Sequence, residues 1–165
     1  MGNHNSLNSR FKGGRLSQKG RGSIRVVAKK NRRTGAKISP KFEVIEGKVV
    51  LDLPIRTVSE ANCFEPWQVK HKRHKEQKRL VAFALMPLKA HVRLPCKIML
   101  TRLAPDELDR FDNLPCSFKY IVDAVCAIIT GNYVAGKADS DKRITLACDQ
   151  VKSKAYGIRI EITNL

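Results

Sequence analysis

Alternation between apolar and polar residues, which starts near position 42, predicts two strands joined by a tight turn. The segment reads KFEVIEGKVVLDLPI, and the apolar positions of its second half share one face: Val49, Leu51, Leu53 and Ile55. Glu46-Gly47 interrupts the alternation, and a glycine there suits the sharp reversal of a hairpin. We therefore expect a hairpin with one buried face.

A long segment without Gly or Pro predicts a helix from Trp67 to Leu85. The preceding Glu65-Pro66 suits a helix start, because proline is tolerated in the first turn. The second half is apolar and should enter the core, whereas the basic first half should face phosphate. Its candidate nucleic-acid contacts are Lys70, Lys72, Arg73 and Lys75. His71 and His74 lack a carboxylate or thiol partner at suitable spacing, so we interpret them as solvated or phosphate-contacting rather than metal-binding.

The remaining pattern predicts a second helix and three more strands. From about Pro115 to Thr130, apolar residues recur at helical spacing: Phe118, Ile121, Val122, Val125 and Ile129. CKIMLTRL precedes this helix as a strand, and KRITLACDQ and YGIRIEITN follow it as two more. The order of elements favours an α+β fold, a mixed β-sheet with two main helices packed on it.

Net charge changes this picture most in the N-terminal segment. The formal net charge is +17, and residues 1–42 hold twelve Lys or Arg and no acid. Much of the rest of the segment is Gly, Ser and Asn, a composition that buries too little apolar surface to offset its ordering entropy. We expect residues 1–40 to be a basic, mostly flexible arm, in which only SIRVVA suits a short strand, and residues 41–165 to be the folded domain. The arm binds nucleic acid, or it is a solubilising tail or an artificial extension.

The composition also bounds the partner and the compartment. So positive a chain implies a polyanionic partner, either nucleic acid or an anionic membrane surface. No apolar run approaches the length of a membrane span, and the N-terminus has no signal-peptide core, so we expect a cytoplasmic protein. Five cysteines without a Cys-x-x-Cys pair argue against a zinc ribbon or a disulfide framework. We expect reduced, mostly buried thiols.

Four acids gather within seven residues of this cationic chain: Asp106, Glu107, Asp109 and Asp112. One interpretation is a solvated loop that balances charge locally. The other is a divalent metal site, because Mg²⁺ prefers a few carboxylate oxygens and acts on phosphate, and a bound cation relieves the repulsion. Lys119 and Asp123 follow on the predicted helix, and Asp139 and Asp141 precede a predicted strand. Together they would offer carboxylates and one lysine around one phosphate.

These motifs, in their order, resemble the RusA-type Holliday-junction resolvases, which are common in prophages. FDNL supplies Asp112-Asn113-Leu114, KYIVDA supplies Lys119 and Asp123-Ala124, and DKRI supplies Asp141 with Ile144 three residues on. Upstream, VVLDLPIRTVSEANCFEP resembles the family's opening strand with its Leu-Pro and Ser-x-Asn loop. The resemblance covers about residues 48–163, includes a final hairpin and leaves out the basic arm.

The resemblance implies a homodimeric, Mg²⁺-dependent endonuclease that resolves four-way DNA junctions by paired nicks in recombination and repair. Asp109, Asp112 and Asp141 would be the catalytic acids and ligate Mg²⁺, with Mn²⁺ as a substitute. Lys119 would be catalytic by positioning or neutralising the phosphate, and Lys119 and Arg110 would contact DNA.

One departure from the family bears on activity. Arg110 stands where the family has its first acid, and we expect Asp109, one residue earlier, to take that role. Without that exchange, the chain would be a catalytically impaired nuclease-fold protein that binds DNA without cutting. A basic RNA-binding protein whose acids are structural is the remaining alternative.

Overall fold

The fold is an α+β arrangement, seen in a computed structural model that describes residues 17–18, 24–27, 40–61, 63–134 and 137–165. Most of the expected basic arm lies outside the described residues. The described helices and strands, in chain order, are β1 (Ser17–Gln18), β2 (Ile24–Val27), β3 (Lys41–Ile45), β4 (Lys48–Leu53), α1 (Trp67–Leu85), the 3₁₀ helix η1 (Met86–His91), β5 (Cys96–Ala104), α2 (Asn113–Thr130), β6 (Ile144–Lys152) and β7 (Gly157–Asn164).

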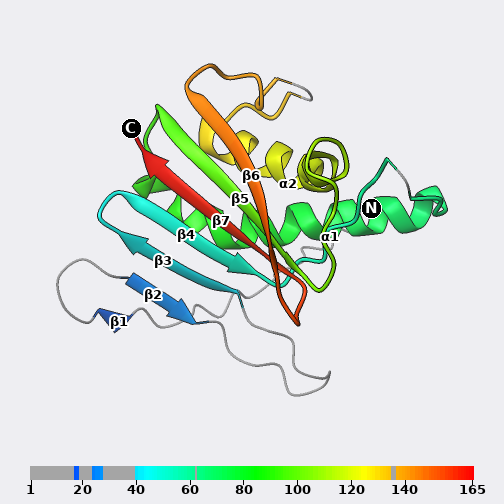
Figure 1. Cartoon of the computed structure of the whole chain (residues 1–165). Helices are drawn as coiled ribbons and strands as arrows, with labels where there is room; N and C mark the ends of the chain where they lie inside the picture. The colour runs from blue at the N-terminus through cyan, green and yellow to red at the C-terminus, as the bar shows by residue number, and fades with distance from the viewer. Residues whose placement is uncertain (1–16, 19–23, 28–39, 62, 135–136) are drawn as a thin grey trace, which may run out of the picture.

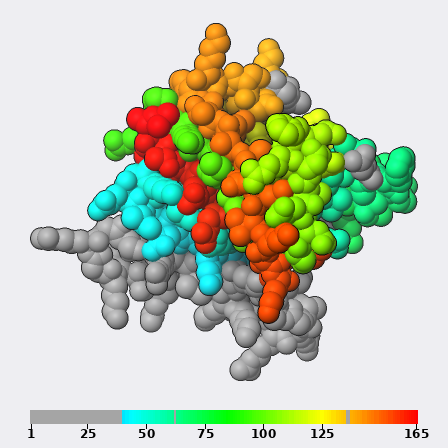
Figure 2. All heavy atoms as spheres, in the orientation of Figure 1, coloured from blue at the N-terminus to red at the C-terminus, as the bar shows by residue number. Residues whose placement is uncertain are grey.

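The strands form one mixed sheet in the order β1-β2-β3-β4-β7-β5-β6. Only the β5–β6 pair is parallel; the other described pairs are antiparallel. Helices α1 and α2 lie together behind the sheet in Figure 1, and the opposite face carries the strands' own side chains in Figure 2. The predicted fold class, a mixed sheet with two main helices packed on it, is confirmed.

Local sequence accounts for the first hairpin. Glu46 and Gly47 adopt φ values of 38° and 81°, and two successive positive φ values are typical of the tight turns whose twist matches antiparallel strands. Alternate residues of β4 are buried beneath the helices, as the pattern predicted: Val49, Leu51 and Leu53. The β3–β4 pair runs in register from Lys41 opposite Asp52 to Ile45 opposite Lys48.

The last two strands do not form the hairpin that the resemblance implied. Both pair with β5 instead, β6 in parallel and β7 antiparallel, so β7 lies between β4 and β5 while β6 is at the edge. Burial explains the difference. The three isoleucines of β7 have no exposed surface, which suits a central strand, whereas β6 exposes most of its side chains. Strands of mixed exposure are tolerated at an edge.

The two helices run in the same direction and pack side by side over the sheet. His74 stacks on Tyr120 with ring centroids 3.4 Å apart, and Lys78 lies 3.7 Å from a carboxylate oxygen of Asp123. These contacts pair successive turns of α1 and α2 in the same order. The first turns of both helices therefore lie at the same end of the domain, next to the segment that follows β5.

Helix α2 combines a core face with an apolar composition. Contrary to the expectation that no apolar run approaches the length of a membrane span, its 18 residues reach a mean hydropathy of 1.2, enough for a span by length and composition, although half of that stretch is buried in the domain. Its buried positions include Phe118, Ile121 and Val125, which pack against the sheet as predicted. The described domain is thus of a small soluble type.

Candidate metal and nucleic-acid site

The acidic loop, residues 105–112, is held against the end of β6 by two hydrogen bonds. The backbone N–H of Leu108 donates to Oε1 of Gln150 at 2.9 Å, and Nε2 of Gln150 donates to the Leu108 carbonyl at 2.6 Å. The Gln150 side chain is buried, where hydrogen bonds gain strength because they are screened little. The loop therefore has a defined position on the sheet.

A buried arginine ties the same loop to the segment that precedes α1. Nε of Arg102 donates to Oγ1 of Thr57 at 3.1 Å, and Nη1 donates to the Asp106 carbonyl. Burial lowers the pKa of Arg102, yet the ordinary value lies so far above neutrality that the guanidinium stays charged. Two loops that are distant in sequence are thereby fixed relative to each other.

Asp109 caps the start of α2 with both carboxylate oxygens. Oδ1 accepts hydrogen bonds from the backbone N–H groups of Phe111 and Asp112 at 3.0 and 3.2 Å. Oδ2 accepts from the backbone N–H and from Nδ2 of Asn113 at 3.0 and 2.6 Å. These bonds, led by that from the Asn113 backbone, hold the pKa of Asp109 below its usual range. A carboxylate offers about four lone-pair sites, so ligation of a metal by Asp109 would require it to release the helix.

Asp112 and Lys119 share one exposed stripe of α2. Residues 112, 116, 119 and 123 recur at the spacing of one helix face. Sγ of Cys116 lies 3.6 Å from Oδ1 of Asp112, and both Asp112 and Lys119 are exposed. Asp123, about one turn beyond Lys119, faces Lys78 of α1. Asp112 and Lys119 thus share a helix face, whereas Asp123, which was expected beside Lys119 at the phosphate, belongs to the contact between the helices.

Asp141 is engaged with an arginine two residues later. Nε and Nη2 of Arg143 donate to its two carboxylate oxygens at 3.0 and 2.7 Å, and the Arg143 backbone N–H donates at 3.0 Å. The side-chain hydrogen bonds, more than any other contact, lower the pKa of Asp141 to about 2. Only a cation that displaces this exposed guanidinium would gain access to both oxygens.

Asp141 also lies at the opposite end of α2 from Asp109 and Asp112. The Arg143 carbonyl accepts from the N–H of Cys96, the first residue of β5, whereas the acidic loop follows the last residue of that strand. The 18 residues of α2, at about 1.5 Å each, separate these ends by about 27 Å. One copy of the chain does not bring the predicted acids together. Among the residues described, no three His, Cys, Asp or Glu side chains form a group that would hold a metal.

Arg110 projects from the acidic loop toward the edge of the sheet. Its Nη2 lies 3.7 Å from Oδ1 of Asp149 in β6, and both side chains are largely exposed. At that distance and exposure the ion pair is weak, because solvent screens it. Arg110 is therefore exposed, its predicted contact with phosphate stays a prediction, and its position shows that the loop reaches the outer strand.

The basic half of α1 divides into exposed and engaged residues. Lys72 and Lys75 are exposed and Lys70 is half-buried, whereas Arg73 is ion-paired with Glu60 at 2.9 Å and with Glu65. Three candidate phosphate contacts thus remain accessible, while Arg73 anchors the loop before α1.

The two histidines of α1 also differ. His71 is exposed, as expected, but Nε2 of His74 lies 2.9 Å from Glu60, so His74 has a structural contact that the sequence did not indicate. Burial acts to raise the pKa of Glu60, but the bonds from His74 and Arg73 outweigh it and the net shift is downward.

A hydrogen bond joins two of the motifs on which the family resemblance rests, although its two residues are 54 positions apart in the sequence. The hydroxyl of Ser59 donates to Oδ1 of Asn113, and the Nδ2 of the same Asn113 donates to Asp109. Ser59 is buried. The loop that carries Ser59 is thus joined to the Asp-Asn motif through a side-chain hydrogen bond. Sequence reasoning identified both motifs but assigned no role to Ser59 or Asn113.

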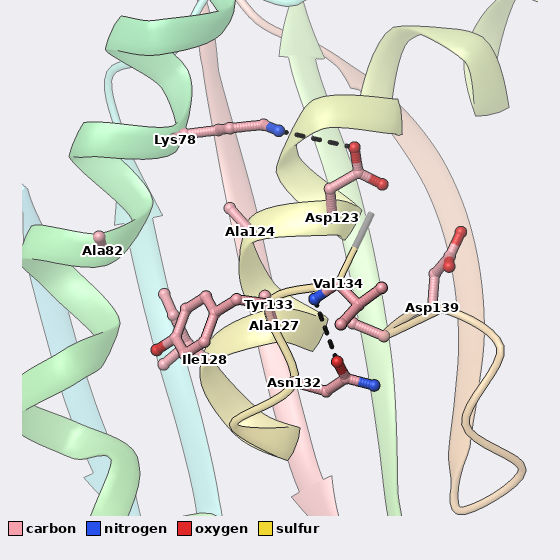
Figure 3. Close-up of a pocket in the computed structure, with 11 residues that line it drawn as sticks. Lys78, Ala82, Asp123, Ala124, Ala127, Ile128, Asn132, Tyr133, Val134 and Asp139 are labelled. Carbon is pink, nitrogen blue, oxygen red and sulfur yellow. Dashed lines mark hydrogen bonds and ion pairs between the residues drawn. The ribbon is translucent and has the colours of Figure 1, made fainter. Parts of the chain in front are cut away.

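A cavity of about 320 Å³ lies between α1, α2 and the segment after α2 (Figure 3). Its walls are mostly apolar, with Tyr133 and Val134 on one side, and Asp123 and Asp139 are at its margin. The Lys78–Asp123 ion pair crosses one end. None of the three acids predicted to bind metal lines this cavity, so it is separate from the acidic loop.

The cysteines and the aromatic residues differ from expectation. All five cysteines are free, but only Cys96 and Cys126 are buried, and burial raises the pKa of the Cys126 thiol to about 12. Sequence reasoning also overlooked Phe64, Trp67 and Phe111, which are strongly exposed. Their signal was position, because they stand outside the apolar periodicity, in CFEPW and DRFDN.

No protein-family model matches this chain, and a search of curated proteins finds no match either.

Proposed function

We propose that this protein is a cytoplasmic, Mg²⁺-dependent endonuclease of branched DNA that acts as a homodimer. The observation that carries the proposal is the convergence at one end of the domain. Arg110 and Asp112 lie in the segment that leads into α2, and the Ser59–Asn113 bond joins this segment to the one that leads into the basic half of α1. The RusA-type resemblance rests on the same motifs, and their meeting in space supports it.

Two copies are needed for the proposed metal site. Asp112 and Asp141 lie at opposite ends of α2, so a cation that both acids ligate requires Asp141 from a second copy. Strand β6 offers the means, because its outer side pairs with none of the described strands and it exposes Leu146 and Val151. If two β6 strands paired antiparallel about a two-fold axis, the start of one would lie beside the end of the other. Asp141 of each copy would then approach the acidic loop of its partner, which contacts β6 near Asp149.

The residues would have distinct roles at such a site. Asp112 and Asp141 of the second copy would hold Mg²⁺, which supplies Lewis acidity and an activated water. Lys119 binds the phosphate charge from the same stripe as Asp112, and Arg110 contacts the neighbouring phosphate. Asp109 positions Asp112 by fixing the first turn of α2. Two such sites in a symmetric dimer suit paired nicks on two strands.

The test mixes two inactive variants, Asp112→Asn and Asp141→Asn, and measures Mg²⁺-dependent nicking of a synthetic four-way junction. Each variant alone should be inactive, while DNA binding survives. In the mixed dimer, one site combines both wild-type acids, so nicking of one strand per junction should return. A site built within a single copy would give no recovery, because neither copy then carries both acids.

A matched control uses two acids of the same loop. A mixture of the Asp112→Asn and Asp109→Asn variants should nick no faster than Asp109→Asn alone, because each site takes both side chains from one copy of the loop. Absence of nicking by the wild-type dimer with either Mg²⁺ or Mn²⁺ would refute the endonuclease proposal.

A second candidate function is DNA binding without cleavage. The observation that favours it is that Asp109 is fully occupied by α2 and Asp141 by Arg143. In that case Asp112→Asn and Asp141→Asn would bind junctions as wild type does, and the wild type would leave them uncut.

A further inference from the structure

Three aromatic side chains lie in solvent where α1 and α2 begin. The exposed fraction is 104% for Phe64, 96% for Phe111 and 70% for Trp67. Burying an aromatic side chain removes a large apolar surface from water and stabilises a protein, so rings left this exposed are informative. We call Phe64, Trp67 and Phe111 the aromatic end.

These residues belong to one end of the domain although they come from different segments. Trp67 is the first residue of α1 and Phe64 lies three residues before it, while Phe111 lies two residues before the start of α2. The two helices run in parallel, and the Ser59–Asn113 hydrogen bond joins the segments that precede them. The rings are therefore displayed from two loops that are bonded to each other.

Both loops are held in place by polar contacts. Glu65, next to Phe64, and Glu60 both pair with Arg73 of α1, and the backbone N–H of Phe111 donates to Asp109 at 3.0 Å. Rings presented from a fixed backbone lose little additional conformational freedom on binding, which favours affinity. The aromatic end is thus a preorganised surface rather than two loose loops.

The basic residues near the aromatic end indicate which kind of partner it binds. Lys70, Lys72 and Lys75 follow Trp67 along α1, and Arg110 is adjacent to Phe111. An apolar protein partner would have to desolvate these cations, whereas a nucleic acid offers phosphates to them and bases to the rings. Nearby cations also add attraction to a base stacked on an aromatic ring.

We infer that the aromatic end binds unstacked bases of DNA, an inference that rests on the proposed function for the choice of DNA as the polymer. The faces of bases in an uninterrupted duplex are covered by their neighbours, so only branched or single-stranded DNA presents them. Phe111 directly precedes Asp112. A base stacked on Phe111 therefore brings its own backbone phosphate toward the proposed metal acid, which links recognition of distorted DNA to the site of cleavage.

Trp67 is the only tryptophan of the chain, so its fluorescence reports on this surface directly. The experiment titrates the full chain, in EDTA, with an oligothymidylate of about twelve nucleotides, a length within the range that single-strand sites cover. A duplex of equal phosphate content is the comparison. We expect quenching by the oligothymidylate and little by the duplex; equal quenching by both, or none by either, would overturn the inference.

The variants Phe111→Ala and Phe64→Ala identify the contacts. Each should weaken oligothymidylate binding by about 5- to 100-fold, the range that loss of one stacked base produces, and leave duplex affinity nearly unchanged. Phe83→Ala is the matched control, because Phe83 is also exposed, at 56%, but lies on the same helix about 24 Å from Trp67. An equal loss from Phe83→Ala would contradict the inference.

Two further outcomes separate this inference from the proposed function. If Phe111→Ala abolishes self-association of the chain and leaves oligothymidylate binding intact, the aromatic end is a protein contact and the inference fails. If the wild type binds oligothymidylate through Phe111 but never nicks a junction, the inference stands and the endonuclease proposal alone fails. The measurements in EDTA do not depend on cleavage, so the two results are independent.

Discussion

At the scale of single residues, the three acids predicted to ligate metal have different surroundings in the folded chain. Asp109 is saturated with hydrogen bonds from the start of α2, Asp112 is exposed with only a weak thiol contact, and Asp141 is paired with Arg143. A carboxylate near a candidate metal site is therefore not interchangeable with the next one along the chain. Two substitutions distinguish these environments.

The first prediction concerns the cap. Asp109→Ala should lower Tm by several degrees, whereas Asp109→Asn should lower it less, because asparagine still accepts hydrogen bonds from the helix N–H groups. The pKa of Asp109 is depressed, so its charge contributes stability above pH ~4 that is lost as pH falls through the lower folded value. The acid side of a Tm–pH profile should flatten in both variants. A wild-type profile in Asp109→Ala would contradict the capping role.

The second prediction concerns Asp141. In Arg143→Gln, the pKa of Asp141 should rise from about 2 toward the ordinary aspartate value, because the guanidinium bonds that favour its charged form are gone. The bonds between Arg143 and the charged Asp141 stabilise the wild type above pH ~4, and this stabilisation disappears as pH falls toward 2. The stability of the variant should therefore depend less on pH in this range. Carbon-detected NMR titration of the carboxyl group measures the pKa. Lys142→Gln, which removes a charge beside the same acid but none of these bonds, is the control.

At the scale of elements, the sequence predicts what is local and misses what is not. Helix α1 begins and ends at the predicted residues, and the turn at Glu46-Gly47 is where the alternation breaks, because these features depend on residues close in the chain. Strand pairing depends on distant partners, so the places of β6 and β7 were not evident. Even so, isoleucine at three alternating positions already indicated a strand with one buried face, and Ile158, Ile160 and Ile162 are all fully buried.

In the candidate site, too, local features were predictable from the sequence and those that depend on the folded chain were not. The motif residues were recognisable from the sequence, but the cap formed by Asp109 depends on backbone N–H groups, which no sequence pattern displays. The bond between Ser59 and Asn113 spans 54 positions, and only the folded chain brings the two together. The separation of Asp112 from Asp141 is likewise a consequence of the parallel β5–α2–β6 connection, which places the two ends of α2 at opposite ends of the sheet.

The third prediction tests the order of the strands. Ile160→Ala should reduce the free energy of unfolding by about 2–5 kcal/mol, the cost of truncating a fully buried isoleucine in a core. Val151→Ala in β6 should cost far less, because that side chain is half exposed at the edge. Urea denaturation of both variants gives the comparison. Similar losses would place the two strands in equivalent environments and contradict the observed order.

At the scale of the whole molecule, the N-terminal part of the sequence is rich in positive charge and holds none of the candidate site residues. Residues 1–38 hold eleven of the 32 Lys and Arg residues and no acid. Charges of one sign on a chain attract any polyanion and confer little selectivity, whereas the aromatic end and the acidic loop belong to the folded domain. Affinity and preference for branched DNA should thus reside in different parts of the chain.

The fourth prediction separates these contributions. Deleting residues 1–38 should flatten the slope of log affinity against log salt, because fewer counterions are released when fewer phosphates are neutralised. The preference for a four-way junction over linear duplex should remain. Fluorescence anisotropy with both DNAs over a range of salt concentrations measures the slope and the preference together. An unchanged slope would show that the segment does not contact DNA.

The central place of β7 has a consequence for how the chain folds. The β3–β4 hairpin and the β5–α2–β6 unit have no strand pairing with each other, and β7 joins them by pairing with β4 on one side and β5 on the other. Asp52 and Arg159, whose side chains bond across one of these pairs, are 107 positions apart. Loops of that length close slowly, so the two halves of the sheet should exist as separate, partly ordered units until β7 inserts between them. Hydrogen exchange during refolding should then show protection arriving at both flanks of β7 in a single late step.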